Sequence, residues 1–238
     1  MRYNKPMINT FRARWSTLTR NQQLVIAAIA AVVLLGLLFS GTFAPSRLLA
    51  VAAVVLVALP VHEFAHAAMA VRLGDNTPKW QGRYTLNPLA HLDPVGALLI
   101  LFTGFGWARP VQWNPRNVNT DLRTASILVS LAGPVSNLLL AILALLLLRL
   151  GLLPGAFLGG FAQAFAFINV ALFVFNLIPV PPLDGSHILY ALWPGISYQV
   201  RGILDQYGFL ILFGIIILAS WVISVPVQIV WRTLNFII

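Results

Sequence analysis

The stretch LVALPVHEFAHAAMAVR, residues 56–72, places two histidines and a glutamate inside a run that is otherwise typical of an apolar helix. In an α-helix, positions i and i+4 lie on one face, so His62 and His66 of the pattern H-E-x-x-H can reach the same metal ion. Glu63 is left free to accept a proton from a water molecule at that ion. The alternative is that the histidines are core residues bonded to backbone carbonyls, with Glu63 at a helix interface. Because each ionisable group in a membrane span costs about 2.5–3.5 kcal/mol on insertion scales, three together favour the metal site.

The composition of the chain indicates an integral membrane protein. Of its 238 residues, 59% are hydrophobic and only 9% are charged, which is too apolar for an ordinary soluble domain. The net charge of +9 does not predict a nucleic-acid partner, because the basic residues are spread among apolar spans. Since the chain has no cysteine, any metal must be held by His, Asp, Glu or carbonyl oxygen.

Hydropathy predicts the membrane-spanning segments. A spanning helix needs about 20 mostly apolar residues, and five runs approach or exceed this length: 24–40, 48–71, 125–150, 157–179 and 207–225. The apolar segment at 97–107 is too short to cross, so we expect it to enter the membrane and return. The stretches RYTL (83–86) and RPVQW (109–113) alternate enough to predict short strands. We therefore predict an all-α polytopic membrane protein with about five to six transmembrane helices, a re-entrant segment and short membrane-associated strands.

The distribution of basic residues predicts a cytoplasmic N-terminus. In that orientation, twelve Lys and Arg residues lie on the cytoplasmic side and only Arg47, Arg149 and Arg232 lie outside, as the positive-inside rule requires. His62 and His66 are then one to two turns from the cytoplasmic edge.

A third metal ligand is needed, because a catalytic zinc takes three protein ligands and leaves one position open. Of the six acidic residues, Asp184 lies where an apolar span meets the Pro-rich break FNLIPVPPLDGSHIL, residues 175–189. The prolines cannot continue a helix and Gly185 permits an unusual backbone angle, so Asp184 can turn inward at the depth of the histidines. The alternative role of Asp184 is an N-cap for a helix that begins near Ser186.

Five motifs follow one another between the apolar spans: HEFAH (62–66), NPLAHLDPVG (87–96), GWARPVQWNPRN (106–117), SLAGPVSN (130–137) and NLIPVPPLDG (176–185). In this order they resemble the site-2 protease family of intramembrane zinc metalloproteases, over about residues 48–192. The resemblance implies one Zn²⁺ per chain, bound by His62, His66 and Asp184, with Glu63 as the general base. The chain lacks an inserted peptide-binding module and a nucleotide-sensing pair, and so is similar to the short, minimal branch of the family.

Two asparagines also match family positions. The resemblance implies that Asn176 lies in the active site, where an amide N–H can steady an oxyanion, although it can equally satisfy carbonyls that the prolines free. Asn137 is expected to hold helices together, with Gly133 allowing their close approach.

Two further histidines lie near these motifs. We interpret His91 and Asp93 as parts of a structured loop, because neither has a second metal-binding residue at helical spacing. His187 is three residues beyond Asp184 and is expected to be a hydrogen-bonding partner near the metal ligands.

The chain is therefore predicted to be a multi-pass intramembrane zinc metalloendopeptidase of the prokaryotic cell membrane. We expect a single membrane domain over 1–238, with an N-terminal basic segment and first span (1–47), a catalytic core (48–192) and a C-terminal span and tail (193–238). Its predicted partners are a transmembrane protein or peptide substrate and the lipid bilayer, with no nucleic acid. A helical substrate must unwind locally, because its carbonyls are hydrogen-bonded within the helix. The alternative is a membrane zinc carrier or sensor without hydrolytic activity, in which Glu63→Gln leaves function intact.

Overall fold

The computed structural model describes residues 44–91, 93 and 108–238. The predicted first span at 24–40 and the predicted re-entrant segment at 97–107 lie outside these residues. Pro45–Ile238 form one compact unit, and within the described residues every regular element is helical. The all-α prediction is thus confirmed for this part of the chain.

The predicted strands at 83–86 and 109–113 are wrong, since neither stretch is extended against a partner strand. The backbone of the second stretch is bonded elsewhere: the Arg109 N–H donates to the His91 carbonyl and the Val111 N–H donates to the Glu63 carboxylate. In residues 109–113 the alternation of polar and apolar residues therefore belongs to a half-buried irregular segment and not to a strand.

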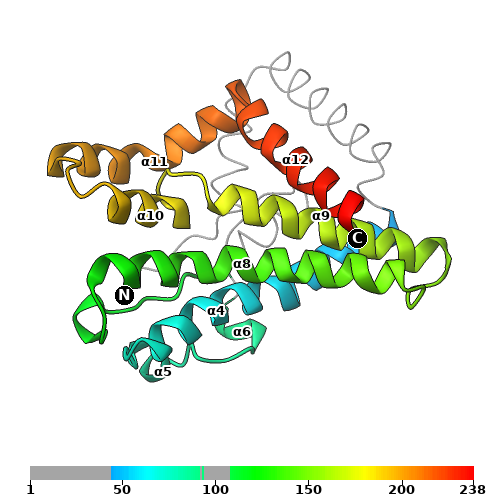
Figure 1. The fold of residues 1–238 in the computed structure, drawn as a ribbon, viewed down its shortest axis with the longest axis horizontal. Helices are drawn as coiled ribbons and strands as arrows, with labels where there is room; N and C mark the ends of the chain where they lie inside the picture. The colour runs from blue at the N-terminus through cyan, green and yellow to red at the C-terminus, as the bar shows by residue number, and fades with distance from the viewer. Residues whose placement is uncertain (1–43, 92, 94–107) are drawn as a thin grey trace, which may run out of the picture. The chain divides into compact units, whose positions relative to one another are not determined.

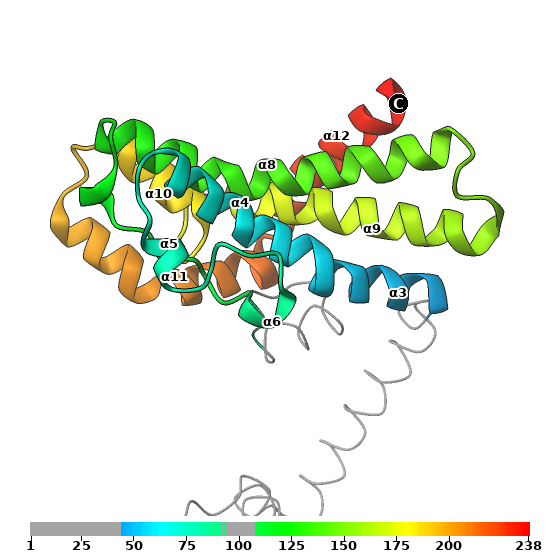
Figure 2. The same ribbon diagram turned by 90° about the horizontal axis from the view of Figure 1, so that it is seen from below.

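The helices and their bounds are α3 (Pro45–Ala53), the π-helix η1 (Val54–Ala58), α4 (Leu59–Arg72), α5 (Thr77–Trp80), α6 (Pro88–His91), the 3₁₀-helix η2 (Pro115–Asn117), α8 (Leu122–Arg149), α9 (Gly155–Asn176), α10 (Asp184–Leu192), α11 (Tyr198–Leu218) and α12 (Trp221–Ile237). Helices α8 and α9 run antiparallel side by side, and α4 packs against α8 (Figures 1 and 2). Among the residues that the structure describes, four segments are long and apolar enough to cross a membrane: Pro45–Arg72, Leu122–Arg149, Gly155–Asn176 and Tyr198–Leu218.

Three predicted spans correspond to these segments, but the span predicted at 207–225 has the wrong bounds. Helix α11 ends at Leu218 and α12 begins at Trp221, so the predicted span crosses a break. The sequence is apolar on both sides of this break, and hydropathy alone therefore does not reveal it. Helix α9 ends at Asn176, ahead of Pro179, and not at 179 as predicted.

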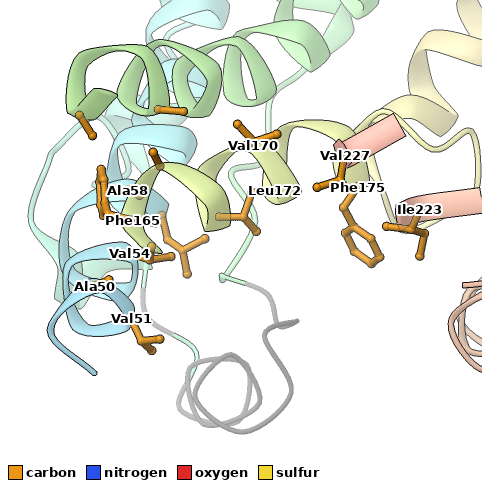
Figure 3. Packing of buried hydrophobic residues seen from close by; sticks show 14 of the residues in the cluster. Ala50, Val51, Val54, Ala58, Phe165, Val170, Leu172, Phe175, Ile223 and Val227 are labelled. Carbon is orange, nitrogen blue, oxygen red and sulfur yellow. The ribbon is translucent and has the colours of Figure 1, made fainter. Parts of the chain in front are cut away.

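The three central helices approach closely through small side chains. The fully buried alanines of α4, α8 and α9 include Ala67, Ala70, Ala125, Ala141, Ala162 and Ala166. Small residues are what allow helix backbones to pack closely in a membrane. Larger apolar side chains fill the remaining core, among them Val54, Val170 and Phe175 (Figure 3).

Helix α4 ends in a Schellman motif at Gly74. Gly74, at φ +108°, takes the left-handed region that favours glycine. The Gly74 N–H donates to the Val71 carbonyl and the Asp75 N–H donates to the Ala70 carbonyl, which is the bond pair of this motif.

The carboxylate of Asp75 joins this turn to residues 114–117 through hydrogen bonds. Asp75 is fully buried. Oδ1 accepts from the Thr77 N–H at 2.9 Å and the Asn117 amide at 3.0 Å, and Oδ2 accepts from the Asn114 N–H at 2.6 Å. Burial alone would raise the pKa of Asp75, but the hydrogen bonds from Thr77, Asn114 and Asn117 outweigh burial and lower the pKa below its ordinary value.

We predict that Asp75→Asn destabilises the protein by about 1–3 kcal/mol, because an amide NH₂ would face hydrogen-bond donors. Since the folded-state pKa is lowered, the wild-type carboxylate stabilises the fold above its unfolded pKa of about 3.9, and this stabilisation is lost as pH falls through the folded pKa. Thermal unfolding in detergent at pH 7 and at acidic pH measures both effects. The control is Asp121→Asn at the exposed N-cap of α8, where Asn caps as well as Asp. Equal melting temperatures of the two variants at pH 7 would contradict the prediction.

Candidate metal centre

The histidine pair lies on α4 just after an irregular turn. Pro60 has no N–H and disfavours a regular helix before it, and the Leu59 N–H donates five residues back to the Val54 carbonyl. Such π-type turns recur at functional sites. From there α4 is regular, so His62 and His66 lie on one face, both buried.

Each imidazole is held through its Nδ1 by a group of α8. His66 Nδ1 lies 2.7 Å from the Val129 carbonyl oxygen, and His62 Nδ1 lies 2.6 Å from Asn137 Oδ1. A carbonyl oxygen can only accept, so His66 Nδ1 carries the hydrogen. In the neutral ring, Nε2 of His66 then has a free lone pair, as a metal ligand requires. The Nε2 atoms of the two rings lie 3.0 Å apart.

Gly133 on α8 leaves room for this pair of imidazoles. A Cβ at this position would overlap with His66 Nε2 and would lie 2.6 Å from His62 Nε2. Gly133 therefore does allow a close approach, as the sequence predicts, and the groups that approach it are the two imidazoles.

Asp184 meets the histidines from α10. Its Oδ2 lies 3.4 Å from the Nε2 of His62 and 3.4 Å from that of His66. This oxygen is buried and has no hydrogen-bond partner. Helix α10 begins at Asp184 itself, with Leu183 in the N-cap position, so Asp184 does not have the alternative N-cap role. The structure thus brings His62, His66 and Asp184 together from two distant parts of the chain.

Gly185 acts differently from the sequence prediction. The described glycines with positive φ are Gly74, Gly82, Gly151 and Gly155. Gly185 is not among them, so the prediction that it is needed for an unusual backbone angle is wrong. A Cβ on Gly185 would overlap with the Leu177 carbonyl and lie 2.5 Å from that of Ile178. The missing side chain lets α10 pack directly on the break after α9, which turns Asp184 inward.

The geometry of these three residues fits a zinc ion. One ligand atom from each lies within 4.8 Å of the others, and three buried acceptor atoms repel one another unless a cation lies between them. Tetrahedral zinc bound at about 2.0–2.1 Å would separate its ligand atoms by roughly 3.3 Å, close to the observed 3.0 and 3.4 Å. Among the described residues this is the one group of three His, Asp or Glu side chains that could hold a metal ion.

Glu63 lies beside this group without belonging to it. Its side chain is 7% exposed, and Oε2 accepts a hydrogen bond of 2.9 Å from the Val111 N–H. Glu63 and the three converging side chains line one cavity of about 260 Å³. Apolar residues such as Leu59, Trp113 and Phe175 complete the wall of this cavity. A carboxylate in this position can exchange protons with a molecule held in the cavity.

Asn176 lines the same cavity. Its Nδ2 donates to the Leu172 carbonyl at 3.0 Å, one turn back on α9. An active-site role of Asn176 stays a prediction.

The other two histidines do not belong to the three-residue group. His91 is buried in α6, and its Nε2 is bonded to the Thr85 carbonyl at 2.8 Å, as in a structured loop. His187 is exposed and lines the cavity.

Several groups that orient the site were not predicted from the sequence. Asn137 joins helices as expected, through its hydrogen bond to Asn169 on α9, but its amide oxygen also accepts from His62, which was not foreseen. Its position in the SLAGPVSN motif was the available signal. Val111 and Val129 contribute backbone groups only, and no side-chain pattern could have found them.

Known proteins resemble this chain in sequence. The sequence profile of Peptidase family M50 matches residues 154–218. YwhC of Bacillus subtilis, named as a candidate zinc metalloprotease, is 44% identical over 189 residues, which cover 76% of this chain and 83% of the relative. Rip2 of Mycolicibacterium smegmatis, similarly named, is 35% identical over 82% of this chain and 78% of the relative. No solved structure matches the chain.

Proposed function

The chain belongs to peptidase family M50, the site-2 protease family, and is an intramembrane zinc metalloprotease; from this we propose that His62, His66 and Asp184 hold its zinc ion and that Glu63 is the general base. The observation that carries the proposal is the convergence of three buried acceptor atoms, one of them the unpartnered Oδ2 of Asp184. Such a set is costly to bury without a cation.

The side chains around the cavity then have distinct tasks. Zinc, when bound, supplies Lewis-acid activation of the peptide carbonyl and of a water molecule. Glu63, held through Oε2 by the Val111 N–H, takes a proton from the attacking water and passes it to the leaving amine. Asn176 is proposed to donate to the oxyanion through its amide.

The hydrogen bonding of a helical substrate supports its local unwinding. A carbonyl inside an α-helix already accepts the N–H four residues ahead, so it is not open to attack while that turn is intact. The cavity that would receive the opened segment is lined by His62, Glu63 and Asp184. We propose that a transmembrane segment of a membrane protein enters the site with its helix opened around the scissile bond.

The membrane placement follows the basic residues. The chain is a multi-pass membrane protein, and we propose that it lies in the cell membrane as a single domain of five to six spans with a cytoplasmic N-terminus. The end of α4 and the start of α8 both adjoin the Lys- and Arg-rich loops, so the site would open toward the cytoplasm.

Incubation of the purified protein with a single-span peptide tests the function. We expect cleavage within the apolar segment, its loss on addition of a zinc chelator, and its return on addition of Zn²⁺. A matched peptide whose helix-weakening Gly residues are replaced by Ala is expected to be cleaved more slowly, because Gly costs about 1 kcal/mol in a helix relative to Ala. Stoichiometric zinc binding without cleavage of any single-span peptide would favour the carrier or sensor alternative.

A further inference from the structure

A line of buried amides leads from the metal site across α8 into α9. Asn137 Oδ1 accepts from His62 Nδ1 at 2.6 Å, and Asn137 Nδ2 donates to Asn169 Oδ1 at 2.9 Å. Asn169 Nδ2 then donates to the Phe165 carbonyl at 2.9 Å, one turn back on α9. Both asparagines are fully buried, on two helices whose other buried residues are mostly apolar. Two uncharged amides buried there call for a reason beyond packing.

The Phe165 carbonyl, at the end of this line, determines which atom donates and which accepts in every hydrogen bond of the line. A backbone carbonyl can only accept, so Asn169 must present its NH₂ group to Phe165 and its oxygen to Asn137. Asn137 must then present its NH₂ group to Asn169 and its oxygen to His62. An amide oxygen can only accept, so the hydrogen of the neutral His62 ring lies on Nδ1. The remaining nitrogen, Nε2, keeps its lone pair and faces Asp184 and His66.

We propose that Asn137 and Asn169 are positioning residues that hold His62 in the one tautomer able to bind the zinc ion. The inference rests on the proposed metal site. Without an acceptor at Nδ1, the ring can place its hydrogen on Nε2, which blocks the ligand position. His66 needs no such line of amides, because its Nδ1 is bonded directly to the backbone carbonyl of Val129. The two proposed ligands on α4 are therefore held in different ways. His66 is held by a backbone carbonyl, and His62 is held by the side chains of Asn137 and Asn169, one behind the other.

A purely structural role of the asparagines predicts a different outcome. If they only join α4, α8 and α9, their replacement lowers stability and leaves the zinc affinity of the folded protein and the tautomer of His62 unchanged. The two roles are separated by measuring these properties on the folded fraction.

The test uses Asn137→Leu, Asn169→Leu and the double variant of the full chain, with Asn169→Ala as a second variant should Leu prevent folding. The control is Val170→Ala, which opens a space at the next buried position of α9 without touching the amides. Zinc affinity is measured by competition with a chelator. We expect Asn137→Leu to bind zinc about 10- to 100-fold more weakly than wild type, which is the usual effect of removing a residue that is hydrogen-bonded to a metal ligand. Asn169→Leu, which is one residue further from the ligand, is expected to bind zinc about 10-fold more weakly. Because the residues act in series, the double variant should be no weaker than Asn137→Leu.

A second readout needs no metal. The chain has four histidines, so ¹⁵N spectra of the zinc-free protein resolve their tautomers, with His62 assigned by its replacement. We expect Nδ1–H alone at His62 in wild type, a mixture in Asn169→Leu, and no change at His66. Wild-type zinc affinity together with a single His62 tautomer in Asn169→Leu would overturn the inference. A wild type that binds no zinc would instead refute the proposed metal site, while the tautomers would still report on the line of amides.

Discussion

Replacing Glu63 by Gln is expected to lower the rate of peptide cleavage by about 100- to 10,000-fold, the usual contribution of a general base, and to leave zinc binding unchanged. The amide cannot accept a proton, yet it has nearly the shape of the carboxylate and can still accept the Val111 N–H through its oxygen. Glu63 is also not among the three side chains that converge on the metal position. Cleavage and zinc content measured on the same preparation test both parts.

The control for this variant is Asp205→Asn on α11. Asp205 accepts from the Tyr190 hydroxyl at 3.2 Å and does not line the cavity, so cleavage should stay at the wild-type rate. Loss of zinc from Glu63→Gln would assign Glu63 a ligand role, against the arrangement described here. Cleavage by Glu63→Gln at the wild-type rate would exclude it as the base.

Gly133→Ala is expected to lower zinc affinity and cleavage by about 100-fold, the upper end of the range for loss of a group that orients one metal ligand, because this change displaces two ligands at once. Its methyl group would occupy the space of the two Nε2 atoms. To move away, His62 and His66 would have to break their hydrogen bonds to Asn137 and Val129. Ala also favours a helix over Gly by about 0.8–1.0 kcal/mol, so the helix itself should not be weakened.

Gly159→Ala on α9 is the matched control for this variant. A Cβ there would lie 3.6 Å from Leu148 Cδ1, an ordinary van der Waals contact, and we expect zinc affinity and cleavage to be unchanged. Zinc content, chelator competition and cleavage are compared for the two variants. Wild-type zinc affinity in Gly133→Ala would show that the two imidazoles do not lie against α8 as described.

Much of the candidate site could be predicted from sequence because its chemistry is local. The i, i+4 spacing places His62 and His66 on one helix face whatever the rest of the chain does. Asp184 could be singled out because acids are rare in this chain and because the prolines before it end a helix. The long apolar helices α8 and α9 were predicted within about a turn for the same reason, since length and hydropathy are properties of the segment itself.

What depends on tertiary contacts could not be predicted. The hydrogen bond from His62 to Asn137 joins residues 75 positions apart. The group that donates to the Glu63 carboxylate is the backbone N–H of Val111. Gly185 was singled out with the wrong reason, because its role is a close approach between backbones and not a local angle. The break between α11 and α12 lies between two apolar segments, where hydropathy carries no information.

Metal analysis and zinc X-ray absorption of the purified wild-type protein, beside Asp184→Asn, test the central claim most directly. We predict one zinc per wild-type chain, bound by two imidazole nitrogens and at least one oxygen at about 2.0–2.1 Å. Asp184→Asn should bind zinc much more weakly, because a neutral amide replaces the anionic ligand. Zinc bound without two imidazoles, or bound as tightly by Asp184→Asn as by wild type, would contradict the account.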